Sequence, residues 1–324
     1  MKSIFGNNLI VSLFGESHGD FIGVTLNGLP SGKRIDYDFL EQELLRRRPK
    51  GEENTKRVEN DDYEIISGVF NGFTTGAPLT ILIKNKDVKS GDYLEGVIRP
   101  GSSDYPSYVR SSGYNDYRGS GHFSGRLTAG LVAGGAIIKK ILEDKGIHIS
   151  SNVADYALDT NDTYGFITKV VVKGLPIGVG EPFFDNMESV LAHLLFAIPS
   201  VKGVSFGDDD IYLHKGSEVV DELKVEDGNV VIKNNHNGGI NGGLSNGNDV
   251  IINVKFKPIS SLRNDINTIN IKTMENITII GNDRNDKSIA NRAPVIVESM
   301  VGFGLMDLLI SFYGSNELKW WKDV

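Results

Sequence analysis

The stretch VTLNGLPSG at residues 24–32 recurs in modified form as VVVKGLPIG at residues 170–178. Two further matches follow in the same order: DYDFLEQELLRRRP (36–49) with FDNMESVLAHLLFAIP (184–199), and SGVFNGFTTG…LTILIK (67–84) with GGINGGLSNG…VIINVK (238–255), where Asn71 is aligned with Asn241. The sequence therefore indicates a duplicated strand–helix–strand unit, over about 20–85 and about 168–258. Chance similarity of glycine-rich turns is the alternative.

Hydrophobic periodicity predicts the elements around these repeats. Strands are expected at residues 9–14, 24–26, 79–83, 169–172, 230–233 and 250–256. Asp36 is expected to cap a helix that ends at Arg46–Arg48. Residues 125–145 and 290–312 are predicted to form helices that are apolar on most sides, and such helices lie inside a fold. We therefore expect an α/β or α+β sandwich, built as one pseudo-symmetric domain over residues 1–324.

Composition excludes several classes of protein. The chain has no cysteine, which excludes thiol catalysis, disulfides and iron–sulfur clusters. A net charge of −8 argues against nucleic acid as the main partner. The N-terminus has no long apolar segment, and Glu298 and Asp307 interrupt the apolar stretch 294–312. A cytoplasmic protein that does not span a membrane is the expectation.

Four arginines, Arg46, Arg47, Arg48 and Arg57, lie close together in this acidic chain. Guanidinium groups bind carboxylates and phosphates through paired hydrogen bonds. The cluster favours a small polyanionic ligand. A solvated helix end is the alternative interpretation.

Two glycine-rich motifs are candidates for chemistry. In Gly15–Gly19 (GESHG) the glycines at the end of a predicted strand expose the imidazole of His18, although a purely structural histidine is the alternative. Neighbouring residues on a strand do not converge on one ion, so a metal site is not expected here. Residues 116–126 (DYRGSGHFSGR) precede a predicted helix, whose N-terminal amides favour an anion. The glycine spacing fits neither a P-loop nor a dinucleotide fingerprint.

Three other segments give weaker signals. Residues 234–243 are rich in asparagine and glycine, which fits a tight turn. Residues 257–261 bring one lysine and two serines together, and residues 284–286 place an arginine beside a carboxylate. Each of these is more simply a surface loop when it is taken alone.

Taken together, the motifs resemble those of the chorismate synthase family, from Phe14 to about Leu309. The matching motifs are GESHG, RRRP, T-x-R-x-E-x-D (55–61), SGV-x-x-G-x-TTG, RPG, DYRG-x-G-x-x-SGR, VKGV, G-x-P-x-FD, KP-x-SS and R-x-D. The resemblance implies a lyase that eliminates phosphate from 5-enolpyruvylshikimate-3-phosphate in an anti-1,4 sense, giving chorismate, the last common step of aromatic amino-acid biosynthesis. It also implies a requirement for reduced FMN, with NADPH as the indirect reductant, a layered β-α-β-α sandwich of α+β class, and a homotetramer.

The resemblance assigns roles by position. His18 corresponds to the acid near the departing phosphate, and Asp286 to the carboxylate that works with the flavin to remove a proton. The residues that correspond to substrate-binding arginines are Arg47, Arg48, Arg57, Arg118 and Arg126. The residues that correspond to flavin-binding positions are His122, Phe123, Ser124, Pro199, Ser200, Gly242, Lys257, Pro258, Ile259, Ser260, Ser261 and Arg284. The resemblance implies no metal.

The chain departs from the family pattern at a few positions. Ser102 replaces a histidine that is assigned to proton transfer with the flavin, and Glu52 and Glu53 fall where a further arginine is usual. Asn285 replaces a histidine beside the carboxylate, and the segment 155–162 is short. Since a serine cannot become a cation, we expect either an anionic flavin hydrogen-bonded to Ser102 or a proton from His122.

Two alternatives to a catalytic chorismate synthase-like lyase remain. A homologue that binds flavin or a polyanion without turnover would keep most of these motifs. A flavin reductase is disfavoured because the sequence has no nicotinamide-binding fingerprint.

Overall fold

The computed structural model describes residues 1–49, 60–86, 91, 93–156, 162–260, 264–280 and 286–314. The larger sheet has the order β1 (Ile4–Phe5), β2 (Ile10–Gly15), β3 (Phe21–Asn27), β7 (Leu79–Lys84), β4 (Tyr63–Ser67). The second sheet has the order β10 (Val201–Phe206), β15 (Val250–Phe256), β9 (Phe166–Lys173), β8 (His148–Tyr156). The α-helices are α1 (Tyr37–Arg47), α2 (Asp104–Arg110), α3 (Thr128–Glu143), α4 (Met187–Phe196) and α5 (Ala293–Tyr313).

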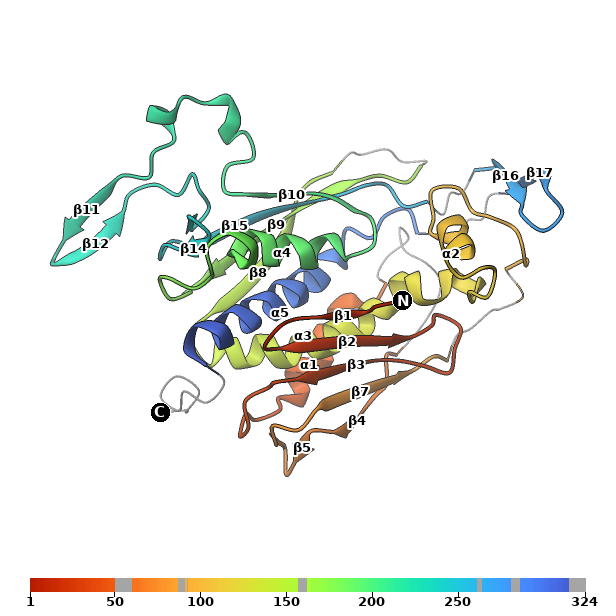
Figure 1. The fold of residues 1–324 in the computed structure, drawn as a ribbon, viewed down its shortest axis with the longest axis horizontal. Helices are drawn as coiled ribbons and strands as arrows, with labels where there is room; N and C mark the ends of the chain where they lie inside the picture. The colour runs from red at the N-terminus through yellow and green to blue at the C-terminus, as the bar shows by residue number, and fades with distance from the viewer. Residues whose placement is uncertain are drawn as a thin grey trace.

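Four two-stranded hairpins complete the described strands. They are β5 (Val69–Phe70) with β6 (Phe73–Thr74), β13 (Ile240–Asn241) with β14 (Leu244–Ser245), β11 (Leu223–Glu226) with β12 (Asn229–Ile232), and β16 (Ile266–Asn270) with β17 (Glu275–Ile279). Figure 1 shows the β11–β12 arm projecting from one end of the molecule, while α2 and the β16–β17 hairpin lie at the other end.

The two sheets have matching topologies. The order β2-β3-β7-β4 in the first sheet corresponds to β8-β9-β15-β10 in the second. Helix α1 follows β3 as α4 follows β9, and α3 follows β7 as α5 follows β15. This correspondence supports the proposal that the chain contains a duplicated unit. It also extends each unit beyond the predicted bounds, so that the first runs from β2 through α3 and the second from β8 through α5.

Matching hydrogen bonds show how closely the two units agree. Thr74 Oγ1 donates to Pro30 O (2.7 Å) and accepts from Lys33 N (2.8 Å). Ser245 Oγ donates to Pro176 O (2.5 Å) and likewise accepts from a backbone N–H, that of residue 179 (2.9 Å). Thr74 is therefore the counterpart of Ser245, at an offset of 171. The pairing of Asn71 with Asn241, at an offset of 170, was therefore wrong by one residue, whereas the matched stretches 67–84 and 238–255 align at the observed offset.

Two glycines explain why the repeated stretch is recognisable. Gly28 and Gly174 end equivalent strands with φ of +88° and +76°. A Cβ on either would lie 2.1 Å from a backbone oxygen, that of Asn8 or of Gly146. Only glycine fits such a close approach at positive φ, so the same residue stands at both positions.

Helices α1, α3, α4 and α5 lie between the two sheets, which confirms the expected α+β sandwich (Figure 1). Helix α3 lies against β3 at Gly130, where an added Cβ would be 3.3 Å from the backbone of Gly23. Helix α5 meets α3 at Gly302 and α4 at Gly304, whose added Cβ would be 2.7 Å from Leu191. Small residues thus bring the helices close to each other and to the first sheet.

Two predicted helix starts differ from the structure. Residues 125–127 form a 3₁₀ turn, because the Ser124 hydroxyl accepts from Arg126 N (3.3 Å), and the α-helix begins at Thr128. The last helix begins at Ala293 rather than at residue 290, with Pro294 in its first turn. The Asp36 cap is confirmed by its bond from Phe39 N (2.9 Å).

Among the described helices, α5 alone is long and apolar enough to cross a membrane. In its most apolar stretch 89% of the residues are buried inside the fold. Both Glu298 and Asp307 have partners there, so this helix serves as the central core element.

Candidate active site

The turn that carries His18 is covered by the glycine-rich loop. Strand β2 ends at Gly15, and Ser17 N donates to Gly121 O (3.1 Å). A Cβ on Gly119, whose φ is +56°, would lie 2.9 Å from the His18 imidazole. The expectation that the flanking glycines expose the imidazole was wrong: the ring is buried beneath the glycine-rich loop, and the Tyr93 ring meets it edge-on at 5.1 Å between centroids. The fold thus brings two motifs from distant parts of the sequence into contact.

The loop itself bends through three successive residues of positive φ, Gly119, Ser120 and Gly121. Before the bend, the Arg118 guanidinium donates to both oxygens of Asp116 (2.8 and 2.9 Å). Burial would raise the pKa of the Asp116 carboxyl, but its bonds and charge contact with Arg118 lower it overall. Arg118, a predicted substrate-binding arginine, is therefore partly exposed, and its guanidinium is already paired with the Asp116 carboxylate.

Two other predicted arginines share one buried carboxylate. Arg47 donates to Asp61 Oδ2 from Nε (3.2 Å) and Nη2 (2.9 Å), and Arg126 Nη1 donates to Asp61 Oδ1. Burial alone would raise the pKa of Asp61, but the charges of the two arginines outweigh it and hold the pKa below its ordinary value. The sequence motif contained Asp61, yet no role for it was predicted.

Asn85 joins this cluster to the His18 turn. Its side-chain oxygen accepts from Arg126 Nε (2.9 Å), and its NH₂ group donates to Glu16 O (3.0 Å) and Gly19 O (2.7 Å). Sequence reasoning missed Asn85. Its one signal is its place directly after β7, at the end of the repeat unit.

The three consecutive arginines at the end of α1 have different surroundings. Arg46 forms a bidentate pair with Glu298 (2.7 and 2.8 Å), and Lys139 bridges Glu298 and Glu43 in the buried space between three helices. Arg48 follows the helix and donates from Nη2 to Asn60 O, and its buried Nε has no hydrogen-bond partner among the described residues. That orphan N–H marks Arg48 as the arginine of this run most in need of an additional acceptor.

Asp286, the predicted base, pairs with Arg292 at the start of α5. Burial is the main reason that the pKa of Arg47 lies below its ordinary value, and the positive charges of Arg126 and Arg292 act in the same direction. Three arginines and two aspartates therefore lie within electrostatic range of one another. The predicted base and the predicted anion ligands belong to one cluster.

A second group of predicted residues surrounds the loop at residues 99–104. Ser260 Oγ donates to Gly101 O (2.6 Å), and Lys257 Nζ contacts both that oxygen (3.4 Å) and Ser260 Oγ (3.2 Å). Lys257 N also bonds to Ser200 O (2.9 Å). Pro199, Pro258 and Ile259 are the chain neighbours of these residues and lie at the same end of the second sheet.

Ser102 lies in this loop, with its hydroxyl engaged in the local turn. Its Oγ donates to Arg99 O (2.7 Å) and accepts from Asp104 N (3.1 Å). Arg99 in turn binds Asp104 (2.7 and 2.8 Å) and the Ser120 hydroxyl (2.7 Å). The loop therefore connects the Lys257 group to the glycine-rich loop. A hydroxyl has one proton, so in this arrangement Ser102 can offer a ligand only a lone pair.

His122 is fixed at both ring nitrogens. Nδ1 lies 2.7 Å from Gly15 O and Nε2 lies 2.5 Å from Ser3 Oγ. A carbonyl only accepts, so Nδ1 carries a proton and the ring connects the N-terminal strand to the His18 turn. Phe123 follows with 40% of its surface exposed, and Ser124 caps the next turn.

Gly242 is remote from the other predicted flavin residues. It forms the turn between β13 and β14, and Met187 N at the start of α4 donates to the neighbouring Gly243 O (3.0 Å). Pro199 lies beyond the far end of α4, roughly 15 Å away at 1.5 Å per helical residue. Arg57, Ser261 and Arg284 lie outside the described residues, as do Glu52, Glu53 and Asn285.

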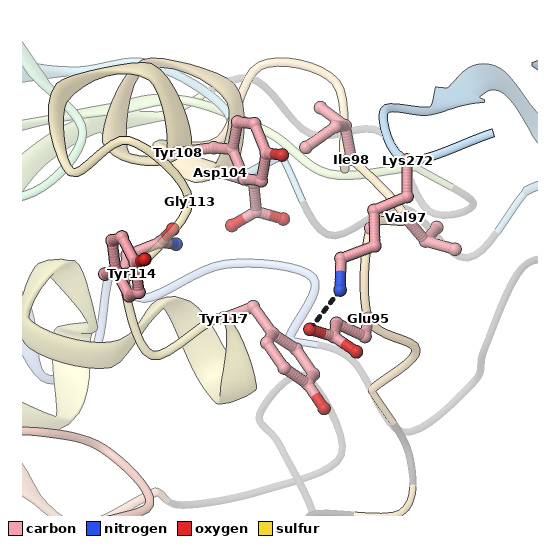
Figure 2. Close-up of a pocket in the computed structure, with 11 residues that line it drawn as sticks. Glu95, Val97, Ile98, Asp104, Tyr108, Gly113, Tyr114, Tyr117 and Lys272 are labelled. Carbon is pink, nitrogen blue, oxygen red and sulfur yellow. Dashed lines mark ion pairs between the residues drawn. The ribbon is translucent and has the colours of Figure 1, made fainter. Parts of the chain in front are cut away.

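A cavity of about 140 Å³ lies beside the site (Figure 2). Asp104, Tyr108 and Tyr117 line it, and the ion pair between Lys272 and Glu95 closes one side. Within the described ranges, no group of three His, Asp or Glu residues could hold a metal ion. The described part of the candidate site brings together a cationic cluster, the covered imidazole of His18 and the carboxylates of Asp61 and Asp286. Such a set can stabilise an anionic leaving group and move protons.

Comparisons with known proteins agree with this geometry. The family model described as chorismate synthase matches residues 9–160 and 154–310. The chorismate synthase of Chitinophaga pinensis is 41% identical over 330 residues, covering 97% of this chain and 98% of that protein. That of Pyrococcus abyssi is 38% identical over 344 residues, covering 94% and 97%. A crystal structure of chorismate synthase has the same fold, with a TM-score of 0.76 at 22% identity over 98% of this chain and 96% of that one.

Proposed function

The chain belongs to the chorismate synthase family of lyases, and on that premise we propose that it converts 5-enolpyruvylshikimate-3-phosphate into chorismate and phosphate with reduced FMN. The observation that carries the proposal is the convergence of His18, the Arg47–Asp61–Arg126 cluster and the Asp286–Arg292 pair. These groups come from both units of the chain and meet where the helices begin or end.

The substrate carries one phosphate and two carboxylates, and the proposed cluster offers several guanidinium groups to them. Arg48 has the buried N–H that lacks an acceptor, and Arg47, Arg118 and Arg126 stand around the same region. Paired hydrogen bonds to anionic oxygens would fix the orientation of the substrate. Arg57 is proposed as a further contact from its sequence position alone.

The elimination breaks one C–O bond and one C–H bond. We assign to His18 the proton that neutralises the departing phosphate, and to Asp286 the acceptance of the proton from carbon. Arg292 fixes the Asp286 carboxylate, and Gly119 and Tyr93 confine the imidazole. Both side chains are held before the substrate arrives, which is what efficient proton transfer requires.

The donors near the 99–104 loop fit a flavin phosphate. Lys257 supplies an ammonium beside Ser200, whose φ of +74° turns the chain at that point. Ser260 would supply a second donor once its hydroxyl proton is released from Gly101 O. Phe123 offers an exposed aromatic face for a ring system. When bound, reduced FMN would supply electron density for the elimination without a net change in oxidation state. NADPH is proposed only as the indirect reductant that regenerates it.

A flavin contact from Gly242 requires a second copy of the chain, because α4 separates this turn from Lys257. The proposed homotetramer would supply that copy. The β11–β12 arm offers an apolar surface for an interface between copies of the chain, because Leu223, Val225 and Val230 are each more than two-thirds exposed. We further propose a cytoplasmic location, with neither nucleic acid nor membrane as a partner.

The test is an anaerobic assay of chorismate formation with dithionite-reduced FMN. Formation of chorismate and an equal amount of phosphate is expected. Binding of FMN and substrate without turnover would favour the alternative of a non-catalytic homologue. Reduction of FMN by NADPH with the protein alone, in the absence of substrate, would show an additional reductase activity.

A further inference from the structure

Asp61 is the most deeply buried ionised side chain of the site. Its side chain has no exposed surface, and those of Arg47 and Arg126 are 6% and 4% exposed. Both carboxylate oxygens are used, one for each arginine. Two cations, Arg47 at the end of α1 and Arg126 in the 3₁₀ turn before α3, are thus joined by one shared carboxylate.

The backbone of Asp61 is also specialised. Its φ of +52° lies in the left-handed region, which few residues other than glycine adopt. Aspartate tolerates this conformation because its short side chain can hydrogen-bond nearby. The chain therefore adopts an uncommon conformation at the residue that delivers the carboxylate between the two arginines.

Without this carboxylate, two like charges would be buried side by side, which is strongly unfavourable. A bound anion would remove the same penalty, since phosphate and carboxylate oxygens accept from the same N–H groups. Asp61 and an anionic ligand therefore have similar interactions with the arginines, and the charge of Asp61 weakens the attraction that the pair exerts on a second anion.

We propose that Asp61 is a resident counter-anion, which keeps Arg47 and Arg126 in place in the free protein and lowers their affinity for external anions. The proposal rests on the proposed function only in taking these arginines as substrate ligands. It assigns Asp61 a positioning and affinity-setting role, not a direct role in bond breaking.

The experiment compares the thermal stability of the full chain and of Asp61→Asn in inorganic phosphate and in chloride at equal ionic strength. We expect Asp61→Asn to lower Tm in chloride and phosphate to restore part of the loss. The apparent Kd for phosphate from the Tm titration should be at least about tenfold tighter than in wild type. Equal phosphate shifts in the two proteins would overturn the proposal.

The matched control is Asp307→Asn. Asp307 is also a buried aspartate, but it accepts from the backbone N–H groups of Asn8 (2.6 Å) and Leu9 (2.7 Å), not from arginines. This substitution should lower Tm with no added response to phosphate. A gain in phosphate response as large as that of Asp61→Asn would also count against the proposal, because the effect would then follow from destabilisation alone.

A second pair of variants covers the case in which Asp61→Asn does not fold. Arg47→Met leaves Asp61 paired with Arg126, and Arg47→Met with Asp61→Asn removes the negative charge of Asp61 from that pair. Phosphate should stabilise the double variant more than Arg47→Met, and equal stabilisation would reject the role of Asp61. Because these measurements need no substrate, they separate this inference from the proposed function, which the chorismate assay tests alone.

Discussion

The first and second units of the molecule share a topology but differ in the chemistry of their first helix. Helix α1 ends in three arginines and shares a buried ionic network with α3 and α5. Its counterpart α4 meets α5 through leucine side chains packed on Gly304. Equivalent positions in one architecture thus carry a charged cluster in one unit and an apolar contact in the other.

The last helices of the two units, in contrast, are alike. Arg126 stands just before α3, and Arg292 just before α5. A cation at a helix N-terminus is disfavoured by the helix dipole. In both places an aspartate, Asp61 or Asp286, is paired with the arginine. Both units therefore have an arginine–aspartate pair at the start of their last helix. They differ in the contacts of their first helix, which are ionic for α1 and apolar for α4.

The largest effect is expected at His18. This residue lies in the first unit, and no residue of the second unit is assigned the same role. His18→Ala should lower turnover by about 10²–10⁴-fold, the usual contribution of a positioned acid or base. Tm should also fall, because the buried ring packs against Tyr93, but the protein should remain folded. The assay is steady-state chorismate formation under anaerobic conditions. His148→Ala, an exposed histidine on β8, serves as the control and should leave turnover unchanged. Unimpaired turnover of His18→Ala would return this residue to a structural role.

The next effect concerns the ionic network of α1, α3 and α5. Lys139→Met leaves the buried Glu43 and Glu298 with Arg46 as their remaining cation. The free energy of unfolding should fall by about 3–5 kcal/mol, as measured by urea denaturation. Adding Glu43→Gln should recover part of the loss, because it removes one uncompensated charge. Additive losses in the double variant would mean that the network is not a coupled unit.

Arg48→Ala tests the division of labour among the three arginines. Removal of a charged hydrogen-bond donor should weaken substrate binding by about 1.5–3 kcal/mol, seen as a raised KM with a smaller change in kcat. Arg110→Ala, at the exposed end of α2, is the matched control. If Arg48→Ala instead lost helicity and kept its KM, the helix-end interpretation of this residue would be preferred.

The ionic network of α1, α3 and α5 should also make the stability of the protein sensitive to acid. Burial would raise the pKa of Glu298, but hydrogen bonds from Arg46 and the charge of Lys139 lower it overall. A carboxyl whose pKa is lower in the folded than in the unfolded chain stabilises the fold at pH values above its unfolded-state pKa, near 4. This contribution is lost as the pH falls through the folded-state pKa. Tm should therefore drop below about pH 4. Glu298→Gln should show a shallower drop, and an identical pH profile would contradict the assignment.

The smallest effect is expected at Ser102. Ser102→Ala removes two turn hydrogen bonds and should cost about 1 kcal/mol of stability. Ser102→His should raise turnover, since an imidazole can exchange a proton near neutral pH. If wild type shows no turnover with reduced FMN and Ser102→His restores none, the non-catalytic interpretation replaces the proposed function.

Elements that follow from local patterns could be predicted from the sequence. The repeated Gly-Leu-Pro stretch, the Asp36 cap and the apolar helices each depend on residues close together in the chain. Composition groups the three arginines after Leu45, and only the resemblance separates Arg47 and Arg48 from Arg46. Helix geometry gives the physical reason for a difference, because successive helical residues point about 100° apart. That geometry sends Arg46 to Glu298 and Arg47 to Asp61.

The contacts that complete the site could not be predicted in this way. Asn85 and Asp61 are ordinary polar residues in sequence, and the partner that they share, Arg126, is 41 and 65 residues away from them. Arg292 was missed for the same reason, because a cation before a helix has no local signal of function. The β11–β12 arm was also not recognised as separate from the second unit, which was predicted over about 168–258. Residues 230–233 were predicted as a strand of that unit because their pattern resembles that of a core strand.

The central position of α5 has a consequence for how the protein is made. This helix packs on α1, α3 and α4 and on strands of the second sheet, so both units depend on it for a closed core. It is also the last α-helix of the described chain to leave the ribosome. Until Tyr313 has been synthesised, the apolar faces of both units lack their shared covering, and the newly made chain must be kept from associating through them.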